Sequence, residues 1–139
     1  RIRVRKSGAE RKRTRMEKQS SHTDLGKTGE RRAALYLERK GYRILRYNYR
    51  CPFGEIDLIA LDPSGEILCF IEVKTRSGTR YGSPWEAVSG RKRSRIRRAA
   101  VHFLSRHPVC CRSVRIDAAE ILYLGGKFYI RYLENVPPG

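Results

Sequence analysis

The spacing of apolar residues along the chain predicts two helices and five strands. Residues 24–40 carry small and aliphatic side chains at helical spacing and are followed by Gly41, which is typical of a helix end. A second helix is predicted over 84–106, because Ser83 and Glu86 form a capping box at its start. Alternating apolar and polar positions predict the strands, which are 42–50, 54–61, 66–75, 114–122 and 127–133.

This order, α-β-β-β-α-β-β, predicts one α/β domain over residues 24–134, with a central mixed β-sheet flanked by the two helices. Residues 62–65 are turn formers that join two strands as a hairpin, and residues 124–126 join the last two strands in the same way. The remaining segment, 135–139, is expected to be a C-terminal tail.

Charge distinguishes the first residues from this domain. Residues 1–22 hold nine Lys or Arg and two Glu with almost no apolar side chain, so residues 1–23 are expected to form a flexible basic arm. Because the only methionine of the sequence is Met16, we interpret residues 1–15 as an extension that the fold does not require.

The whole chain of 139 residues carries 31 Lys or Arg and 14 Asp or Glu, which gives a formal net charge of +17. This excess favours a polyanionic partner, nucleic acid first and an anionic membrane surface second. The longest apolar run, 67–71, has five residues, which excludes a membrane span, and the N-terminus lacks the apolar segment of a secretory signal. We therefore expect a cytoplasmic protein with no membrane partner, whose four cysteines are reduced thiols.

Charged residues also lie inside two predicted strands. Glu55 and Asp57 share one face of their strand, and Glu72 and Lys74 share one face of the next. If the connecting loop at 62–65 has an even number of residues, Asp57 and Glu72 fall on the same face of the hairpin. Two carboxylates and an ammonium group are therefore predicted to converge. Because like charges at cross-strand distance repel, we expect a cation or a proton between the acids.

A hard cation is the interpretation that the ligand types favour. Carboxylate oxygens suit Mg²⁺ or Mn²⁺, and a metal held by Asp57 and Glu72 could bind a phosphodiester oxygen and lower the pKa of a bound water, while Lys74 adds positive charge. The alternative is an ordinary ion pair of Lys74 with either acid on a solvated strand face. The flanking runs 58–61 and 68–71 look buried on both faces, which favours the metal site.

Two residues of the predicted helices are further candidates for this site. Glu30 shares a helix face with apolar residues and could reach the sheet, but an acid near a helix start is equally explained by the helix dipole. Lys92 lies on the apolar stripe of the second helix, where it either extends to solvent along its aliphatic stem or contacts phosphate. We treat Lys92 and Glu55 as accessory residues.

A strongly basic segment follows in the second helix, where residues 91–98 hold six basic side chains in eight positions. Such a run is often only a solvated helix face. The overall charge favours contact with a phosphate backbone, because neutralising phosphates releases counterions. The residues expected to bind nucleic acid are Arg76, Arg91, Arg93, Arg95, Arg97 and Arg98.

Several of these motifs together resemble a known family. Gly29-Glu30, the sequence GEIDLI at 54–59, EVKTR at 72–76 and the capped segment 81–92 are similar to the YraN-like family of small uncharacterised bacterial proteins, over about residues 24–134. That family resembles in turn the restriction-endonuclease-like PD-(D/E)xK superfamily, which includes archaeal Holliday-junction resolvases and has an α-β-β-β-α-β core around a mixed sheet.

The resemblance implies roles for individual residues. Asp57 and Glu72 would be metal ligands together with the carbonyl of Val73, Lys74 would be the catalytic lysine, and Glu30 would be the helix acid. The implied function is a Mg²⁺- or Mn²⁺-dependent endonuclease that cleaves DNA, with branched or structured DNA as the expected substrate. The alternative is a protein of the same fold that binds DNA or RNA without cutting it. We expect DNA before RNA as the partner, and a homodimer is compatible with the sequence.

Overall fold

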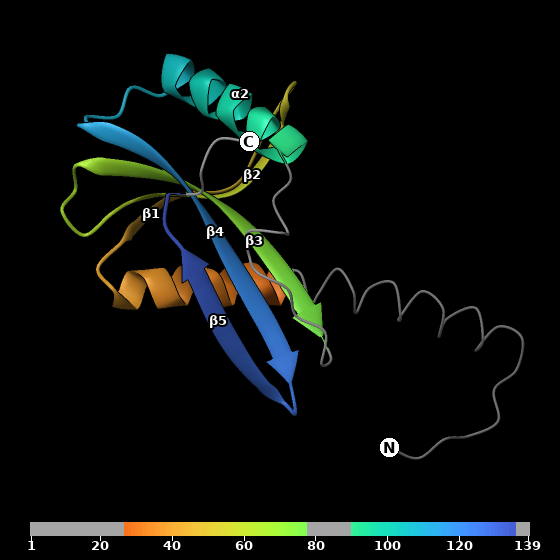
Figure 1. The fold of residues 1–139 in the computed structure, drawn as a ribbon. Helices are drawn as coiled ribbons and strands as arrows, with labels where there is room; N and C mark the ends of the chain where they lie inside the picture. Colours follow the sequence, from red (N-terminus) through yellow and green to blue (C-terminus); the bar gives the residue numbers. More distant parts are fainter. Residues whose placement is uncertain (1–26, 78–89, 136–139) are drawn as a thin grey trace, which may run out of the picture.

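The computed structural model of the protein describes residues 27–77 and 90–135, with side chains described from Arg93 onward in the second segment. The predicted elements and their order are confirmed wherever the structure describes them. These elements are a helix at 27–39, β1 (Arg43–Cys51), β2 (Gly54–Leu61), β3 (Ile67–Ser77), α2 (Gly90–Arg106), β4 (Ser113–Leu124) and β5 (Lys127–Leu133) (Figure 1).

Some predictions fall on residues that the structure does not describe. The basic arm at 1–23 and the capping box at Ser83 and Glu86 lie outside the described residues. The helix is described from Gly90, so its predicted start at residue 84 stays a prediction. The side chains of Arg91 and Lys92 also lie outside the described part of the chain.

The five strands form one mixed sheet in the order β1-β2-β3-β4-β5. β1, β2 and β3 pair antiparallel, β3 and β4 pair parallel, and β5 returns antiparallel to β4. A parallel pair cannot be joined by a tight turn, so the chain crosses from β3 to β4 through α2. The predicted mixed α/β sheet is confirmed.

The two helices cover opposite faces of this sheet (Figure 1). The predicted apolar stripe of α2, which includes Ile96, Ala99 and Phe103, is buried against Ile59 and Phe70. On the other face of the sheet, the helix at 27–39 packs against β2 and β3. This second buried cluster contains Ala33, Ala34 and Leu37 from the helix and Leu58 and Ile71 from the strands. Covering both faces explains why β2 and β3 contain continuous apolar runs.

The helix at 27–39 approaches β3 very closely at Gly29. A Cβ atom at this position would lie 1.9 Å from Oγ1 of Thr75, well inside van der Waals contact. Only glycine permits this approach, because it has no side chain to collide with the strand. The close contact holds the start of the helix, and with it Glu30, against the sheet.

The cysteines and the helices can be compared with the sequence-based expectations. Cys51, Cys69, Cys110 and Cys111 all carry free thiols, as expected. Within residues 27–77 and 90–135, no helix is long and apolar enough to cross a membrane.

Candidate active site

Asp57 and Glu72 lie where β2 and β3 stop pairing with each other. The antiparallel register between these strands ends at the pair formed by Leu58 and Ile71. One step further along the same register, Asp57 stands opposite Glu72, as the even-numbered loop predicts. The Asp57 carboxylate accepts a hydrogen bond of 2.7 Å from the backbone N–H of Val73. A side chain of one strand thus binds the backbone of the next at the point where the ladder opens.

The acid pair is buried and electrostatically strained. Glu72 is only 7% exposed. Burial, followed by the negative charge of Glu72, raises the pKa of Asp57 to about 8. The hydrogen bond from Val73 acts in the opposite direction but does not offset these effects, and the charge of Glu30 adds to them. At neutral pH and without a bound cation, the acid pair therefore favours one protonated carboxyl group over two charged carboxylates.

Glu30 reaches this acid pair from the helix at 27–39. Burial raises its pKa, a hydrogen bond with the Asn48 side chain lowers it, and the charges of Glu55 and Glu72 raise it again. The hydrogen bond with Asn48 joins Glu30 to β1, so of the two interpretations that the sequence left open, the structure supports contact with the sheet. The helix dipole alone does not account for this placement.

Asn48 is a site residue that sequence reasoning missed. It lies inside β1 and has a positive φ of 49°. Its neighbours Tyr47 and Tyr49 pair with Leu58 and Ile56 of β2, so Asn48 stands opposite Asp57. A positive φ inside a strand is strained for most residues, and Asn tolerates it better than most. The sequence signal was available, because Asn is unfavourable in the interior of a strand.

Solvent reaches Glu30 and Asn48 through an open polar cavity of about 400 Å³. Its remaining walls are formed by Lys27, Arg31 and Tyr47. An anionic ligand would be attracted to this opening by the two basic side chains, while the acids below would repel it in the absence of a cation. The cavity therefore admits an anionic ligand, but a cation is needed between this ligand and the acids.

Lys74 and Glu55 lie at the border of the site. Lys74 is exposed and stands in register with Glu120 of β4. Within the described part of the chain no ion pair joins Lys74 to Asp57 or Glu72, so the structure does not form the ordinary ion pair considered as the alternative. Glu55 is exposed and pairs with Arg50 at 3.8 Å.

The oxygen atoms at the strand junction fit a hard divalent cation. Among the described residues, no three Asp, Glu, His or Cys side chains are arranged closely enough to form a metal site alone. Mg²⁺ does not require such a cage, because it is commonly bound by one or two carboxylates and keeps several waters or substrate oxygens. Asp57, Glu72 and the carbonyl of Val73 would supply oxygen ligands of that kind.

The predicted nucleic-acid contacts divide into two groups. Arg95, Arg97 and Arg98 of α2 are exposed and free to meet a phosphate backbone. Arg93 is half-buried, and Arg76 is largely buried beside Glu120, with 3.7 Å between its Nε and a carboxylate oxygen. Arg76 and Arg93 are therefore less accessible than the sequence suggested.

Two buried acids of β4 were also missed. Glu120 is buried beside β3 and accepts a hydrogen bond of 2.6 Å from Arg131 of β5. Asp117 is fully buried and binds three partners, which are Arg115 at 2.9 Å, the Tyr132 hydroxyl at 2.5 Å and the backbone N–H of Asn135 at 2.8 Å. The signal that revealed Asp57, a carboxylate inside an apolar strand, is present at both positions.

The helices on both faces of a mixed sheet, with an α-β-β-β-α-β-β order, define a restriction-endonuclease-like α/β fold. The sequence profile described as "Uncharacterised protein family UPF0102" matches residues 29–121, and the chain belongs to this family. This confirms the resemblance to YraN-like proteins.

Curated relatives support the assignment. A UPF0102 protein of Alkaliphilus metalliredigens is 44% identical over 111 residues, which cover 80% of this chain and 95% of the relative. A UPF0102 protein of Frankia casuarinae is 55% identical over 93 residues, which cover 67% of this chain and 77% of the relative.

Proposed function

We propose that the protein is a metal-dependent endonuclease that cleaves phosphodiester bonds in DNA. The observation that carries this proposal is the buried pair of Asp57 and Glu72, in which the pKa of Asp57 is raised to about 8. A pair of acids held together in this way destabilises the metal-free fold. Such an arrangement is typical of sites where carboxylates serve catalysis rather than stability.

Each residue around the acid pair would have a separate role in hydrolysis. A Mg²⁺ or Mn²⁺ ion held by Asp57, Glu72 and the Val73 carbonyl would supply positive charge to the scissile phosphate and lower the pKa of a water. Lys74, exposed beside the pair, would donate a hydrogen bond to the phosphate or to the attacking water. Glu30 would accept a proton or a hydrogen bond from the opposite side of the opening.

DNA would be held by the basic surface next to this opening. The exposed arginines Arg95, Arg97 and Arg98 lie on α2, which packs on the face of β3 that carries Glu72. Contacts of this kind position a phosphate backbone without reading sequence. Branched or otherwise structured DNA is the substrate we propose, and the cytoplasm is the compartment in which such a protein would meet it.

A second candidate is a DNA- or RNA-binding protein of the same fold that does not cut. The described residues offer a two-carboxylate site rather than three closely grouped ligands, and the α2 arginines can bind phosphate without a metal. A binding function gives no role to the buried pair of Asp57 and Glu72, and for this reason we prefer the endonuclease function.

The experiment that separates the two candidates is a cleavage assay of the purified protein on end-labelled linear, flap and four-way DNA, with Mg²⁺ or Mn²⁺. The nuclease proposal predicts metal-dependent products that are abolished in Glu72→Gln, while the affinity for DNA stays equal or increases because a negative charge is removed. A wild-type protein that binds these substrates but cuts none of them with either metal would favour the binding protein.

A further inference from the structure

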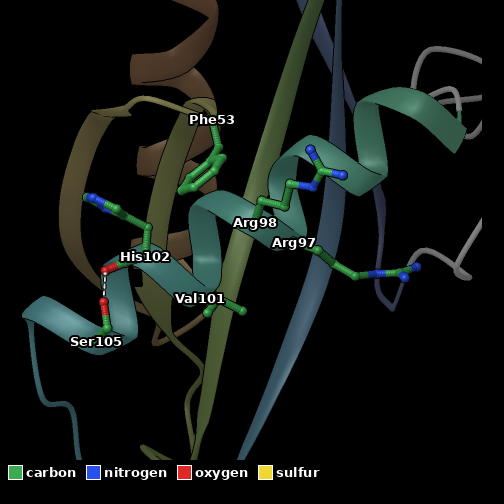
Figure 2. Close-up of a pocket in the computed structure, with 6 residues that line it drawn as sticks. All are labelled: Phe53, Arg97, Arg98, Val101, His102 and Ser105. Atoms are coloured by element: carbon green, nitrogen blue, oxygen red, sulfur yellow. Dashed lines mark hydrogen bonds between the residues drawn. The ribbon is translucent and has the colours of Figure 1, made fainter.

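A shallow apolar pocket lies beside the β1–β2 turn, on the outer side of α2 (Figure 2). Its volume is about 400 Å³ and its walls are almost entirely apolar. Phe53 enters from the turn, and α2 supplies the rest of the lining, which is Arg97, Arg98, Val101, His102 and Ser105. Phe53 is 46% exposed and Val101 is 67% exposed. Clustered exposure of large apolar groups is typical of a binding surface. We call this set of six residues the Phe53 pocket.

The Phe53 ring contacts a hydrogen-bonded histidine of the same pocket. The rings of Phe53 and His102 meet edge to face, with 6.1 Å between their centroids and an interplanar angle of 68°. His102 is fixed in turn by a hydrogen bond of 2.6 Å between its Nδ1 and the hydroxyl of Tyr49. The aromatic platform is therefore oriented before any ligand arrives, which lowers the entropic cost of stacking on it.

The rim of the Phe53 pocket is positively charged. Arg97 and Arg98 are exposed lining residues, and in Figure 2 both side chains extend from α2 on the side away from His102. Neither arginine forms an ion pair within the described segments. An aromatic platform with cations at its rim matches one chemical unit, a nucleotide, whose base presents a flat π-face and whose phosphate carries negative charge.

We propose that the Phe53 pocket binds an unpaired nucleobase of the DNA substrate, stacked on Phe53, with its neighbouring phosphates at Arg97 and Arg98. This inference rests on the proposed function, because it assigns the kind of DNA that the same protein takes. Bases inside a duplex are already stacked on each other, so only a single-stranded segment or an extruded base can occupy this pocket.

The Phe53 pocket lies close to the acid pair along the chain. Phe53 precedes Asp57 by four residues, so their Cα atoms are separated by at most about 14 Å of extended chain. A DNA strand advances about 3.4 Å per nucleotide at duplex spacing. A base on Phe53 would therefore lie within about four nucleotides of a phosphate at Asp57. The substrate class that follows is DNA with unpaired nucleotides close to the bond that is cut, such as a flap or a strand junction.

The test measures DNA affinity in EDTA, so that cleavage plays no part, with the full chain and with single-stranded and blunt duplex DNA of equal length. Phe53→Leu keeps an apolar side chain but removes the ring, and Phe53→Trp keeps a ring. The matched control is Tyr129→Leu, because Tyr129 is a similarly exposed aromatic residue on β5, at the sheet edge opposite β1. Unchanged thermal transitions would show that all variants fold.

Phe53→Leu should weaken binding of the single strand by about 5- to 150-fold, the effect of losing one base stack, and change duplex binding by less than twofold. Phe53→Trp and Tyr129→Leu should bind both DNAs as the wild type does. A single strand carrying 5-iodouracil should photo-cross-link to Phe53 in the wild type.

Equal affinities of Phe53→Leu and wild type for the single strand would overturn the proposal, as would an equal loss for both DNAs. A concentration-dependent dimer that Phe53→Leu dissociates would overturn it as well, because a second copy would then occupy the pocket. These outcomes are independent of cleavage: a wild type that cuts no DNA but shows the Phe53-dependent preference would refute the nuclease and support the pocket.

Discussion

The backbone N–H of Val73 on β3 donates a hydrogen bond of 2.7 Å to the carboxylate of Asp57 on β2. This contact crosses the point where the two strands stop pairing and holds Asp57 beside Glu72. The acid pair is therefore positioned by the protein itself, before any metal binds. Repulsion between the two acids lowers the free energy of unfolding of the metal-free protein, and this loss can be measured.

Asp57→Asn should stabilise the metal-free protein, and the gain should depend on pH. The unfolded chain loses the Asp57 proton near its ordinary pKa of 3.8, and the folded chain loses it near pH 8. Between these values the folded state binds more protons, so the wild type loses stability as pH rises from about 4 to 8. The advantage of Asp57→Asn should grow over this range and level off above pH 8, with an upper limit of about 6 kcal/mol, because the pKa differs by about four units and each unit corresponds to about 1.4 kcal/mol.

Urea unfolding in EDTA at pH 5 and pH 8 measures this effect. Glu38→Gln is the control, because Glu38 is an exposed acid of the helix at 27–39 and its replacement should change little at either pH. An advantage of Asp57→Asn that is the same at both pH values would mean that Asp57 is ionised in the fold throughout.

Gly29→Ala should displace the helix that carries Glu30. The added Cβ would lie 1.9 Å from Thr75 Oγ1 and 3.1 Å from Thr75 Cβ, so either the helix or the strand must move, at a cost of about 1 to 3 kcal/mol. Thr75→Ala removes the nearest atom, and in the double variant it should restore part of the lost stability. Thr75→Ser retains the hydroxyl and should restore less. A double-mutant cycle with no coupling energy would contradict the close approach.

Asp117→Asn should be strongly destabilising. It removes the charge that compensates the largely buried Arg115, and it weakens the short hydrogen bond from the Tyr132 hydroxyl. The expected loss is about 3 to 5 kcal/mol. The control is Glu66→Gln, which breaks an exposed ion pair with Arg112 at 3.7 Å and should cost less than about 1 kcal/mol. Equal losses in the two variants, measured by chemical unfolding, would show that the Asp117 network is not a buried ion pair.

The strands and helices were predictable because their signals are local. The residues at 62–65 and the alternation on either side of them define the hairpin of β2 and β3, and its even loop length fixes the register that places Asp57 opposite Glu72. Burial on both faces was predictable for the same reason, since 58–60 and 68–71 contain no polar residue.

The features that were missed depend on which strands become neighbours. Glu120 faces Arg131 across the predicted hairpin of β4 and β5, but it stands beside Lys74 only because β3 and β4 pair parallel. Neither the strand order nor this pairing can be read from a local pattern. Asn48 was missed because its role depends on contact with Glu30, which the packing of the helix at 27–39 against the sheet brings about.

Exposed arginines of α2 should contribute directly to the salt dependence of DNA binding. Replacing Arg95 and Arg97 together with Gln should make the slope of log affinity against log salt shallower by about 2, because two phosphate contacts are lost. The same change at Arg39 and Arg43, which are also exposed, is the control and should leave the slope within about 0.5. Equal changes in the two double variants would show that binding follows net charge and not the α2 surface.

Direct titration of Mn²⁺ into the metal-free protein by calorimetry tests the central claim that Asp57 and Glu72 form a divalent-metal site. The wild type should bind one ion at a saturable site, Asp57→Asn and Glu72→Gln should each weaken binding by at least 10-fold, and Glu38→Gln should bind as the wild type does. A wild type that shows no saturable Mn²⁺ binding, or binding that survives both substitutions unchanged, would contradict the metal site and with it the proposed nuclease.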